Sequence, residues 1–155
     1  MTALRTGPPA IESLLPHRDP ALLVRVVTEL AAEEITCIAV VPGDHPLVER
    51  GRAPCLLGIE AAAQAAAALE ALSRAAGGPP EPRVGYLVGV RDAAFHAADL
   101  AAGWPLRVTV RATGSAPPLA VYEATVEVDG ELAMTATLST YLAPDPTQHP
   151  GPDAP

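Results

Sequence analysis

One long apolar stretch, rich in alanine, lies near the middle of the chain. Elsewhere the hydrophobic residues occur in short runs, some of which alternate with polar residues. Residues 54–76 are dominated by alanine, the strongest helix former, and Gly77-Gly78-Pro79-Pro80 follows as a stop signal. We expect one long helix here, with Pro54 in its first turn. Because nearly all its side chains are methyl groups, a sheet can pack closely around this helix.

The other periodic segments predict β-strands. Leu106, Val108 and Val110 alternate with polar residues, which is typical of a strand with one buried face. Asp129-Gly130, between two such runs, indicates a type I′ hairpin. A short helix is expected at residues 10–15 and a turn at 114–118. Strands are expected at residues 21–27, 34–41, 84–95, 105–112, 119–128 and 131–142, with the first two pairing antiparallel.

This order of elements predicts an α+β fold in which a curved antiparallel sheet surrounds one long helix. We expect a flexible N-terminus at residues 1–9, a single domain at 10–143 and a disordered, Pro-rich tail at 144–155. The edge strands and the apolar excess suggest that the chain forms dimers.

The amino-acid composition limits the classes of molecule that the protein can bind. The chain has 155 residues, is 49% hydrophobic, has a mean hydropathy of +0.23 and carries a formal net charge of −8. All ten basic residues are arginine. Because nucleic-acid binding needs a basic surface, this charge argues against it.

The cellular location follows from the cysteines and the apolar segments. Cys37 and Cys55 form no disulfide framework and fit a reducing compartment. The N-terminus lacks the pattern of a signal peptide, and polar residues interrupt the long apolar stretch, which is too short to span a bilayer. We therefore expect a cytoplasmic protein without a membrane span.

Glu60 on the apolar helix and His45 in the preceding loop are the main candidates for chemistry. A carboxylate on a buried helix must be paired, hydrogen-bonded or protonated, which suits a general acid. Gln64 lies one turn later and can bind Glu60 or face the same cavity. The backbone amide of Cys55, near the expected helix start, is a candidate oxyanion donor. His45 alone is more often a surface residue, so spacing makes this set only suggestive.

Several ordered motifs resemble the FabA/FabZ-type 3-hydroxyacyl-acyl-carrier-protein dehydratases. The resemblance covers roughly residues 10–142, and the glycine at 103 and the strand at 106–110 follow in register. Its motifs are Leu14-Leu15-Pro16-His17-Arg18-Asp19-Pro20-Ala21-Leu22-Leu23-Val24, Gly58-Ile59-Glu60-Ala61-Ala62-Ala63-Gln64, Gly85-Tyr86-Leu87-Val88-Gly89-Val90-Arg91-Asp92-Ala93-Ala94-Phe95 and Val128-Asp129-Gly130-Glu131-Leu132-Ala133.

The resemblance implies the hotdog fold and a dimer whose sites take the histidine from one subunit and the carboxylate from the other. By this resemblance His45 is the base that removes a Cα proton, Glu60 is the acid that protonates the departing hydroxyl, and the Cys55 amide binds the thioester oxygen. The implied reaction converts 3-hydroxyacyl thioesters to trans-2-enoyl thioesters, with an acyl carrier protein as partner.

The loop after His45 departs from the family pattern. Residues 46–55 lack the Phe-Pro-Gly run that usually follows the histidine and are about one residue longer. This loop resembles the ApeP-like branch of aryl-polyene and polyketide-type clusters more closely. Two alternatives stay open: an acyl thioesterase, or a non-catalytic, acyl-binding subunit of a heterodimeric dehydratase.

Other polar residues have weaker signals. Arg50 and Arg52 are candidates for docking an acidic carrier protein, and scattered solvated arginines are an equally good interpretation. The Cys55 thiol is a minor candidate for a nucleophile. His17 is interpreted mainly as a structural residue that packs near the site. The spacing of histidines and cysteines predicts no metal site, and no nucleotide fingerprint is present, so no cofactor is expected.

Overall fold

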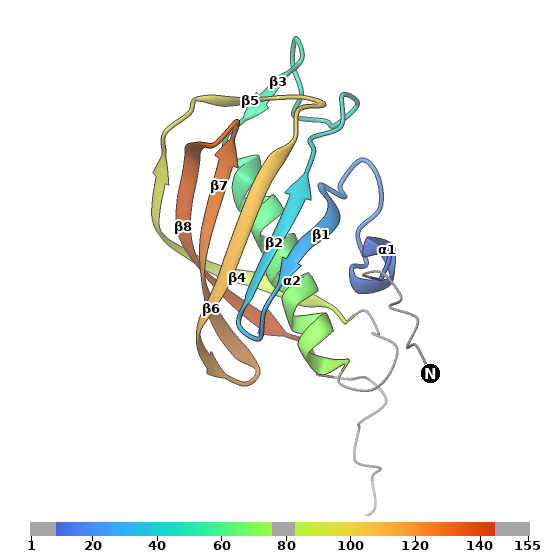
Figure 1. The fold of residues 1–155 in the computed structure, drawn as a ribbon, viewed down its shortest axis with the longest axis vertical. Helices are drawn as coiled ribbons and strands as arrows, with labels where there is room; N and C mark the ends of the chain where they lie inside the picture. The colour runs from blue at the N-terminus through green and yellow to red at the C-terminus, as the bar shows by residue number, and fades with distance from the viewer. Residues whose placement is uncertain (1–8, 76–82, 145–155) are drawn as a thin grey trace, which may run out of the picture.

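A long helix packed on a curved sheet dominates the computed structural model, which describes residues 9–75 and 83–144 (Figure 1). The expected flexible N-terminus and disordered tail lie almost wholly outside these residues. The elements are α1 (Ile11–Leu14), β1 (Val24–Leu30), β2 (Glu34–Ala39), β3 (Arg52–Pro54), α2 (Leu57–Arg74), β4 (Gly85–Phe95), β5 (Asp99–Ala101), β6 (Leu106–Ala116), β7 (Leu119–Val128) and β8 (Glu131–Leu142).

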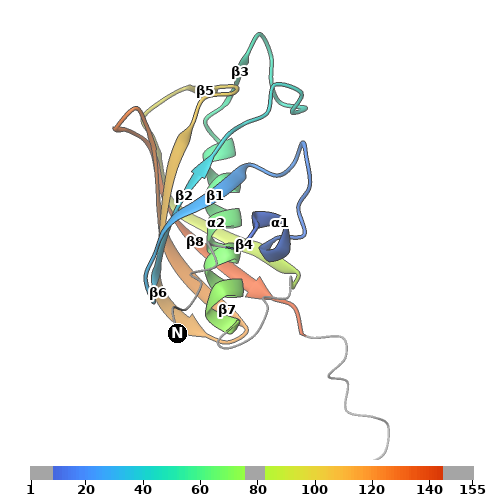
Figure 2. The ribbon, with the colours of Figure 1, turned by 45° about the vertical axis from the view of Figure 1, so that its right-hand side comes forward.

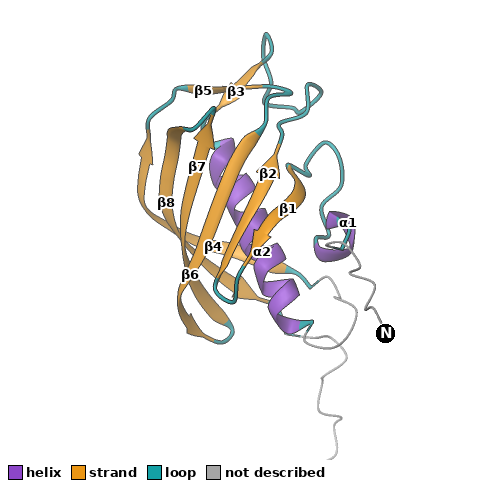
Figure 3. Cartoon of the chain, in the orientation of Figure 1, coloured by secondary structure: helices purple, strands orange, loops and turns teal. Residues whose placement is uncertain are grey.

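The sheet is antiparallel and covers α2 with one face. Its strand order is β1-β2-β6-β7-β8-β4, while β3 and β5 form a separate two-stranded ladder. Figure 2 shows the sheet curling around α2, with α1 on the same side as that helix. Figure 3 shows the same single layer of strands against one long helix. The predicted α+β architecture is therefore confirmed.

Small side chains on α2 allow the sheet to approach closely. Ala61, Ala62 and Ala65 are fully buried. At Gly58 even a methyl group would lie 3.3 Å from the Met134 Sδ atom of β8, so only glycine fits there without a shift. The alanine-rich composition thus serves packing against the sheet as well as helix propensity.

The predicted helix boundaries were partly wrong. Pro54 belongs to β3, where it pairs with Asp99 of β5, and α2 begins three residues later at Leu57. Between them the Gly58 amide donates to the Cys55 carbonyl, so the chain turns before the helix starts. A three-residue strand has too few positions to show alternation, which is why β3 and β5 were missed. The predicted stop at residues 77–80 lies outside the described residues.

The hairpins follow the predicted pattern with one exception. Asp129 and Gly130 have φ values of 52° and 79°, which a type I′ turn between β7 and β8 requires. The turn expected at residues 114–118 was placed too early, because β6 continues to Ala116. A register shift between Ala112 and Gly114 leaves Thr113 without its own partner in the ladder, while Gly114 still pairs with Val121 of β7.

Strand β4 is an edge strand with an apolar sequence that the described residues leave uncovered. It pairs with β8 along one side, and most of its residues are exposed. Tyr86 and Val88 on one face, and Leu87 and Val90 on the other, are between 38% and 56% exposed. Apolar side chains on both faces of an edge strand indicate a surface for another protein chain. Among the described helices, none is long and apolar enough to cross a membrane.

Candidate active site

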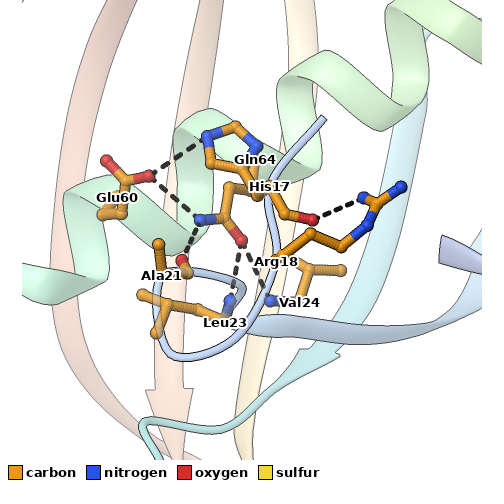
Figure 4. Close-up of polar contacts among 7 residues, drawn as sticks. All are labelled: His17, Arg18, Ala21, Leu23, Val24, Glu60 and Gln64. Atoms are coloured by element: carbon orange, nitrogen blue, oxygen red, sulfur yellow. Dashed lines mark hydrogen bonds and ion pairs between the residues drawn. The ribbon is translucent and has the colours of Figure 1, made fainter. Parts of the chain in front are cut away.

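Gln64 is the buried polar centre of the candidate site. It is 1% exposed and uses both ends of its amide group in hydrogen bonds. Its Nε2 donates to Glu60 Oε1 at 2.9 Å and to the Ala21 carbonyl at 2.8 Å. Its Oε1 accepts from the Leu23 amide at 2.9 Å and the Val24 amide at 3.2 Å (Figure 4). One side chain therefore joins the helix to the segment that leads into β1, and it orients the Glu60 carboxyl group.

Glu60 lies at the rim of a cavity and not in the apolar interior. The sequence predicted a desolvated carboxylate, but 43% of its side chain is exposed in the single chain. Residues of β4 and β8, among them Tyr86 and Tyr141, line the same cavity as Glu60. The pairing with Gln64 that the spacing predicted is present.

A cavity of about 150 Å³ extends along this face of α2. From Glu60 to Arg74 the helix rises about 21 Å, and alanines lie between the polar ends. Polar groups mark both ends, and methyl groups leave space in the middle, an arrangement that suits an elongated, mostly apolar ligand. The lining residues are Leu14, His17, Glu60, Ala63, Gln64, Ala66, Ala67, Glu70, Arg74, Arg83, Gly85, Tyr86, Leu87, Tyr122, Thr140, Tyr141 and Leu142.

His17 contributes to the site more directly than the sequence indicated. Its Nε2 lies 3.6 Å from Glu60 Oε1, on the same oxygen that Gln64 contacts (Figure 4). Its Nδ1 is buried and has no hydrogen-bond partner among the described residues. The Leu-Pro-His-Arg run was the available signal, but sequence spacing could not place this loop over α2.

His45 belongs to the loop between β2 and β3. Figure 1 shows this loop at the end of the molecule where α2 begins. It is half-buried, and its Nδ1 accepts a hydrogen bond from the Leu47 amide at 3.1 Å. It is not among the residues that line the cavity beside Glu60. The single chain therefore does not bring the predicted acid and base together.

Cys55 does not have the surroundings that the sequence predicted. Its amide donates to the Ala98 carbonyl at 3.3 Å and so is not an unpaired helix-start amide. Its thiol is 3% exposed, and burial raises the thiol pKa, which opposes a role as nucleophile. The helix starts at Leu57, so Cys55 precedes it, and the Cys55 thiol donates to the Ala133 carbonyl of β8 at 3.5 Å.

The two candidate docking arginines differ. Arg52 forms an ion pair with Asp99, which neutralises its charge locally and raises the pKa of its guanidinium group further. Arg50 is exposed, has a φ of 53° and makes no ion pair with the described residues. Within residues 9–75 and 83–144, no cluster of three or more His, Cys, Asp or Glu side chains is arranged to hold a metal ion.

Known proteins are similar to this chain in sequence and in fold. The family model of ApeP-like dehydratases matches residues 9–150. The FabZ 3-hydroxyacyl-[acyl-carrier-protein] dehydratase of Streptococcus thermophilus is 35% identical over 137 residues, which cover 84% of this chain and 92% of that protein. The corresponding FabZ of a Janthinobacterium species is 34% identical over 134 residues, covering 83% and 85%.

Solved structures extend the likeness in fold. The dehydratase heterocomplex ApeI:P from Xenorhabdus doucetiae includes a chain that is 22% identical, with a TM-score of 0.81, covering 91% of this chain and 95% of that one. A hypothetical thioesterase from Streptococcus pneumoniae is 12% identical with a TM-score of 0.56, covering 76% and 84%, so it shares the fold alone. The chain belongs to the ApeP-like dehydratase family and has the hotdog fold of a 3-hydroxyacyl thioester dehydratase.

Proposed function

We propose that this protein dehydrates 3-hydroxyacyl groups carried as thioesters on an acyl carrier protein, in a site that two chains build together. The observation that carries this proposal is the Glu60 carboxyl group, held by Gln64 at the rim of an elongated cavity, on a chain of a dehydratase family. The product is the trans-2-enoyl thioester, and the C3 hydroxyl leaves as water.

Glu60 is the proposed acid. The leaving hydroxyl group departs as water only if it receives a proton, and a carboxyl group at the cavity rim can supply one. Gln64 fixes its rotamer through the hydrogen bond to Oε1, so the carboxyl group meets the substrate without first losing side-chain freedom. The alanine-lined part of the cavity then receives the acyl chain beyond C3.

His45 of a second chain is the proposed base. It must remove a proton from Cα, so one ring nitrogen has to face the substrate without a proton. In the single chain the Leu47 amide donates to Nδ1, which leaves the proton of the neutral ring on Nε2. Breaking this exposed contact costs about 1 kcal/mol, so docking of a second chain can reorient the ring.

Strand β4 is the proposed surface for that second chain. Pairing of β4 with an equivalent strand would continue the sheet, satisfy the free backbone edge and bury its apolar side chains. Gly85, Tyr86 and Leu87 of β4 also line the cavity beside Glu60, so a chain docked here reaches the site. Both a second copy and a related subunit fit this surface, and the heterocomplex ApeI:P is an example of the second kind.

An acyl carrier protein is the proposed donor of the substrate. The FabZ relatives carry that carrier in their name. With a net charge of −8, this chain needs local positive charge where an acidic carrier docks, and Arg50 on the His45 loop is the better candidate of the two arginines.

The experiment supplies a 3-hydroxyacyl thioester of the carrier protein and measures enoyl product and free thiol separately. The native protein is expected to form the enoyl thioester without thiol release. Glu60→Gln is expected to lower the rate by about 10²- to 10⁴-fold, and His45→Ala by a similar factor. His96→Ala, which changes an exposed histidine outside the cavity, is the matched control and should retain the native rate.

Thiol release by the native protein would favour the thioesterase alternative. Dehydration that survives both Glu60→Gln and His45→Ala would overturn the assignment of the two residues. No enoyl product with any partner or acyl chain would support the non-catalytic, acyl-binding subunit.

A further inference from the structure

We infer that His17 is a positioning residue that, together with Gln64, directs N–H donors at Glu60 Oε1 and so holds the acid proton on Oε2. This inference rests on the proposed role of Glu60 as the acid. It goes further by assigning the proton to one atom and by giving a role to a histidine outside the acid–base pair. The contacts that carry it belong to one chain (Figure 4).

The loop that carries His17 is held at both ends. On one side, the Arg18 guanidinium donates to the carbonyls of Leu15 at 2.9 Å and His17 at 2.7 Å. On the other, Gln64 binds the backbone of residues 21–24, as described above. Leu14 and Leu15 are buried beneath it. The imidazole is therefore placed over Glu60 by its own backbone, without depending on the contact to the carboxyl group.

The surroundings of the imidazole favour one tautomer. A proton on Nδ1 would be a buried donor without an acceptor, because no described residue offers one. A proton on Nε2 faces the carboxyl oxygen of Glu60 and leaves only a lone pair unsatisfied at Nδ1. The Nε2–Oε1 separation of 3.6 Å exceeds a hydrogen bond, and a movement of about 0.5 Å would close it, as active-site contacts do when substrate binds.

Two donors aimed at one oxygen decide where the acid proton lies. Oε1 accepts from Gln64 and faces the Nε2–H of His17, so a proton on Oε1 would point at groups that cannot accept it. Oε2 has no hydrogen bond to any described residue and is the atom left for the proton. The charged groups farther along the cavity do not compete, since Glu70 pairs with Arg74 and Arg83 donates to the Ala143 carbonyl. The acid proton is thus directed away from the protein and toward the substrate.

The kinetic test replaces the imidazole by groups of similar size. His17→Phe should lower kcat about tenfold with less than a twofold change in KM, because it removes one donor and little packing. His17→Gln restores an N–H and should recover part of that loss. His96→Phe is the matched control, and thermal unfolding of each variant separates lost folding from lost rate.

A double variant that also carries Glu60→Gln tests whether His17 acts by positioning the acid or has a general structural role. If His17 acts through the acid proton, adding His17→Phe to Glu60→Gln should leave the residual rate unchanged. A further tenfold loss in the double variant, or equal rates for the native and His17→Phe proteins, would overturn the inference.

Nitrogen NMR of the imidazole is an independent test that needs no activity. At a pH where the ring is neutral, His17 should be the Nε2–H tautomer, and its Nε2 resonance should shift in Glu60→Gln. An Nδ1–H tautomer, or a resonance insensitive to Glu60, contradicts the inference. If the native protein dehydrates nothing, the proposed function fails, while this spectrum still decides the place of His17.

Discussion

The two halves of the proposed site are built in different ways. Glu60 is positioned by a buried amide that binds two segments of the fold, and a second side chain faces the same oxygen. His45 lies on a loop, and its hydrogen bonds to described residues, which are to Pro42, Leu47 and Val48, all stay within that loop. The acid half of the proposed site, which is Glu60 with Gln64 and His17, is complete within one chain. The base half, which is the loop with His45, is not.

This difference explains why the proposed acid and base lie apart in the single chain. A side chain that is held by the protein core reaches its final position when the chain folds. A side chain on a loop is positioned by whatever packs against that loop. The exposed β4 strand lies beside the acid half, so a second chain docked there can bring its own loop to Glu60. The protein is therefore expected to be inactive as a monomer.

The largest effect is expected from a change that prevents docking on β4. Val88→Arg places a charge on a residue that is 56% exposed in the single chain, and it should yield a monomer by analytical ultracentrifugation. Dehydration should fall at least about 100-fold, because no second chain supplies the base. Leu30→Arg, at a residue 54% exposed on the opposite edge strand, is the control and should keep both the dimer and the rate. An active Val88→Arg monomer would place the base within the same chain.

A middle-sized effect on stability should distinguish the two halves. Gln64→Leu leaves the Leu23 and Val24 amides and the Ala21 carbonyl without a partner, so the free energy of unfolding should fall by about 3 kcal/mol. His45→Ala removes only an exposed contact and should cost less than about 1 kcal/mol. Urea denaturation monitored by circular dichroism measures both. Equal costs would show that the His45 loop is held as firmly as the acid half.

The smallest effect concerns the carrier protein. Arg50→Glu should raise KM for carrier-bound substrate about fivefold and leave KM for a short thioester mimic unchanged, since only the carrier is acidic. Arg52→Ala is the matched comparison and should have a weaker effect, because Asp99 already neutralises that guanidinium. Equal changes for both substrates would show that Arg50 touches the acyl end and does not dock the carrier.

Much of the fold could be predicted because its signals are local. Alternation marked β6, Asp129-Gly130 marked the hairpin between β7 and β8, and alanine content marked α2. The start of α2 was wrong because Pro54 suits a first helical turn as well as an edge strand, and only the ladder to β5 decides between them.

The candidate site was less predictable for the same physical reason. The i,i+4 contact of Glu60 with Gln64 follows from helix geometry and was foreseen. The contact of His17 with Glu60 depends on how a loop packs on a helix, and the spacing of residues in the sequence does not reveal that packing. The Cys55 amide was expected to be unpaired, but it donates to the Ala98 carbonyl in the segment between β4 and β5, and no pattern in the sequence placed that segment beside it.

Mixing two inactive variants tests the shared site most directly. His45→Ala keeps Glu60 and Glu60→Gln keeps His45, so a dimer with one chain of each contains one native site. After unfolding and refolding together at equal amounts, random pairing should restore about one quarter of the native rate. If the mixture forms heterodimers but is no more active than either variant alone, the two residues do not meet across chains, and the account is wrong.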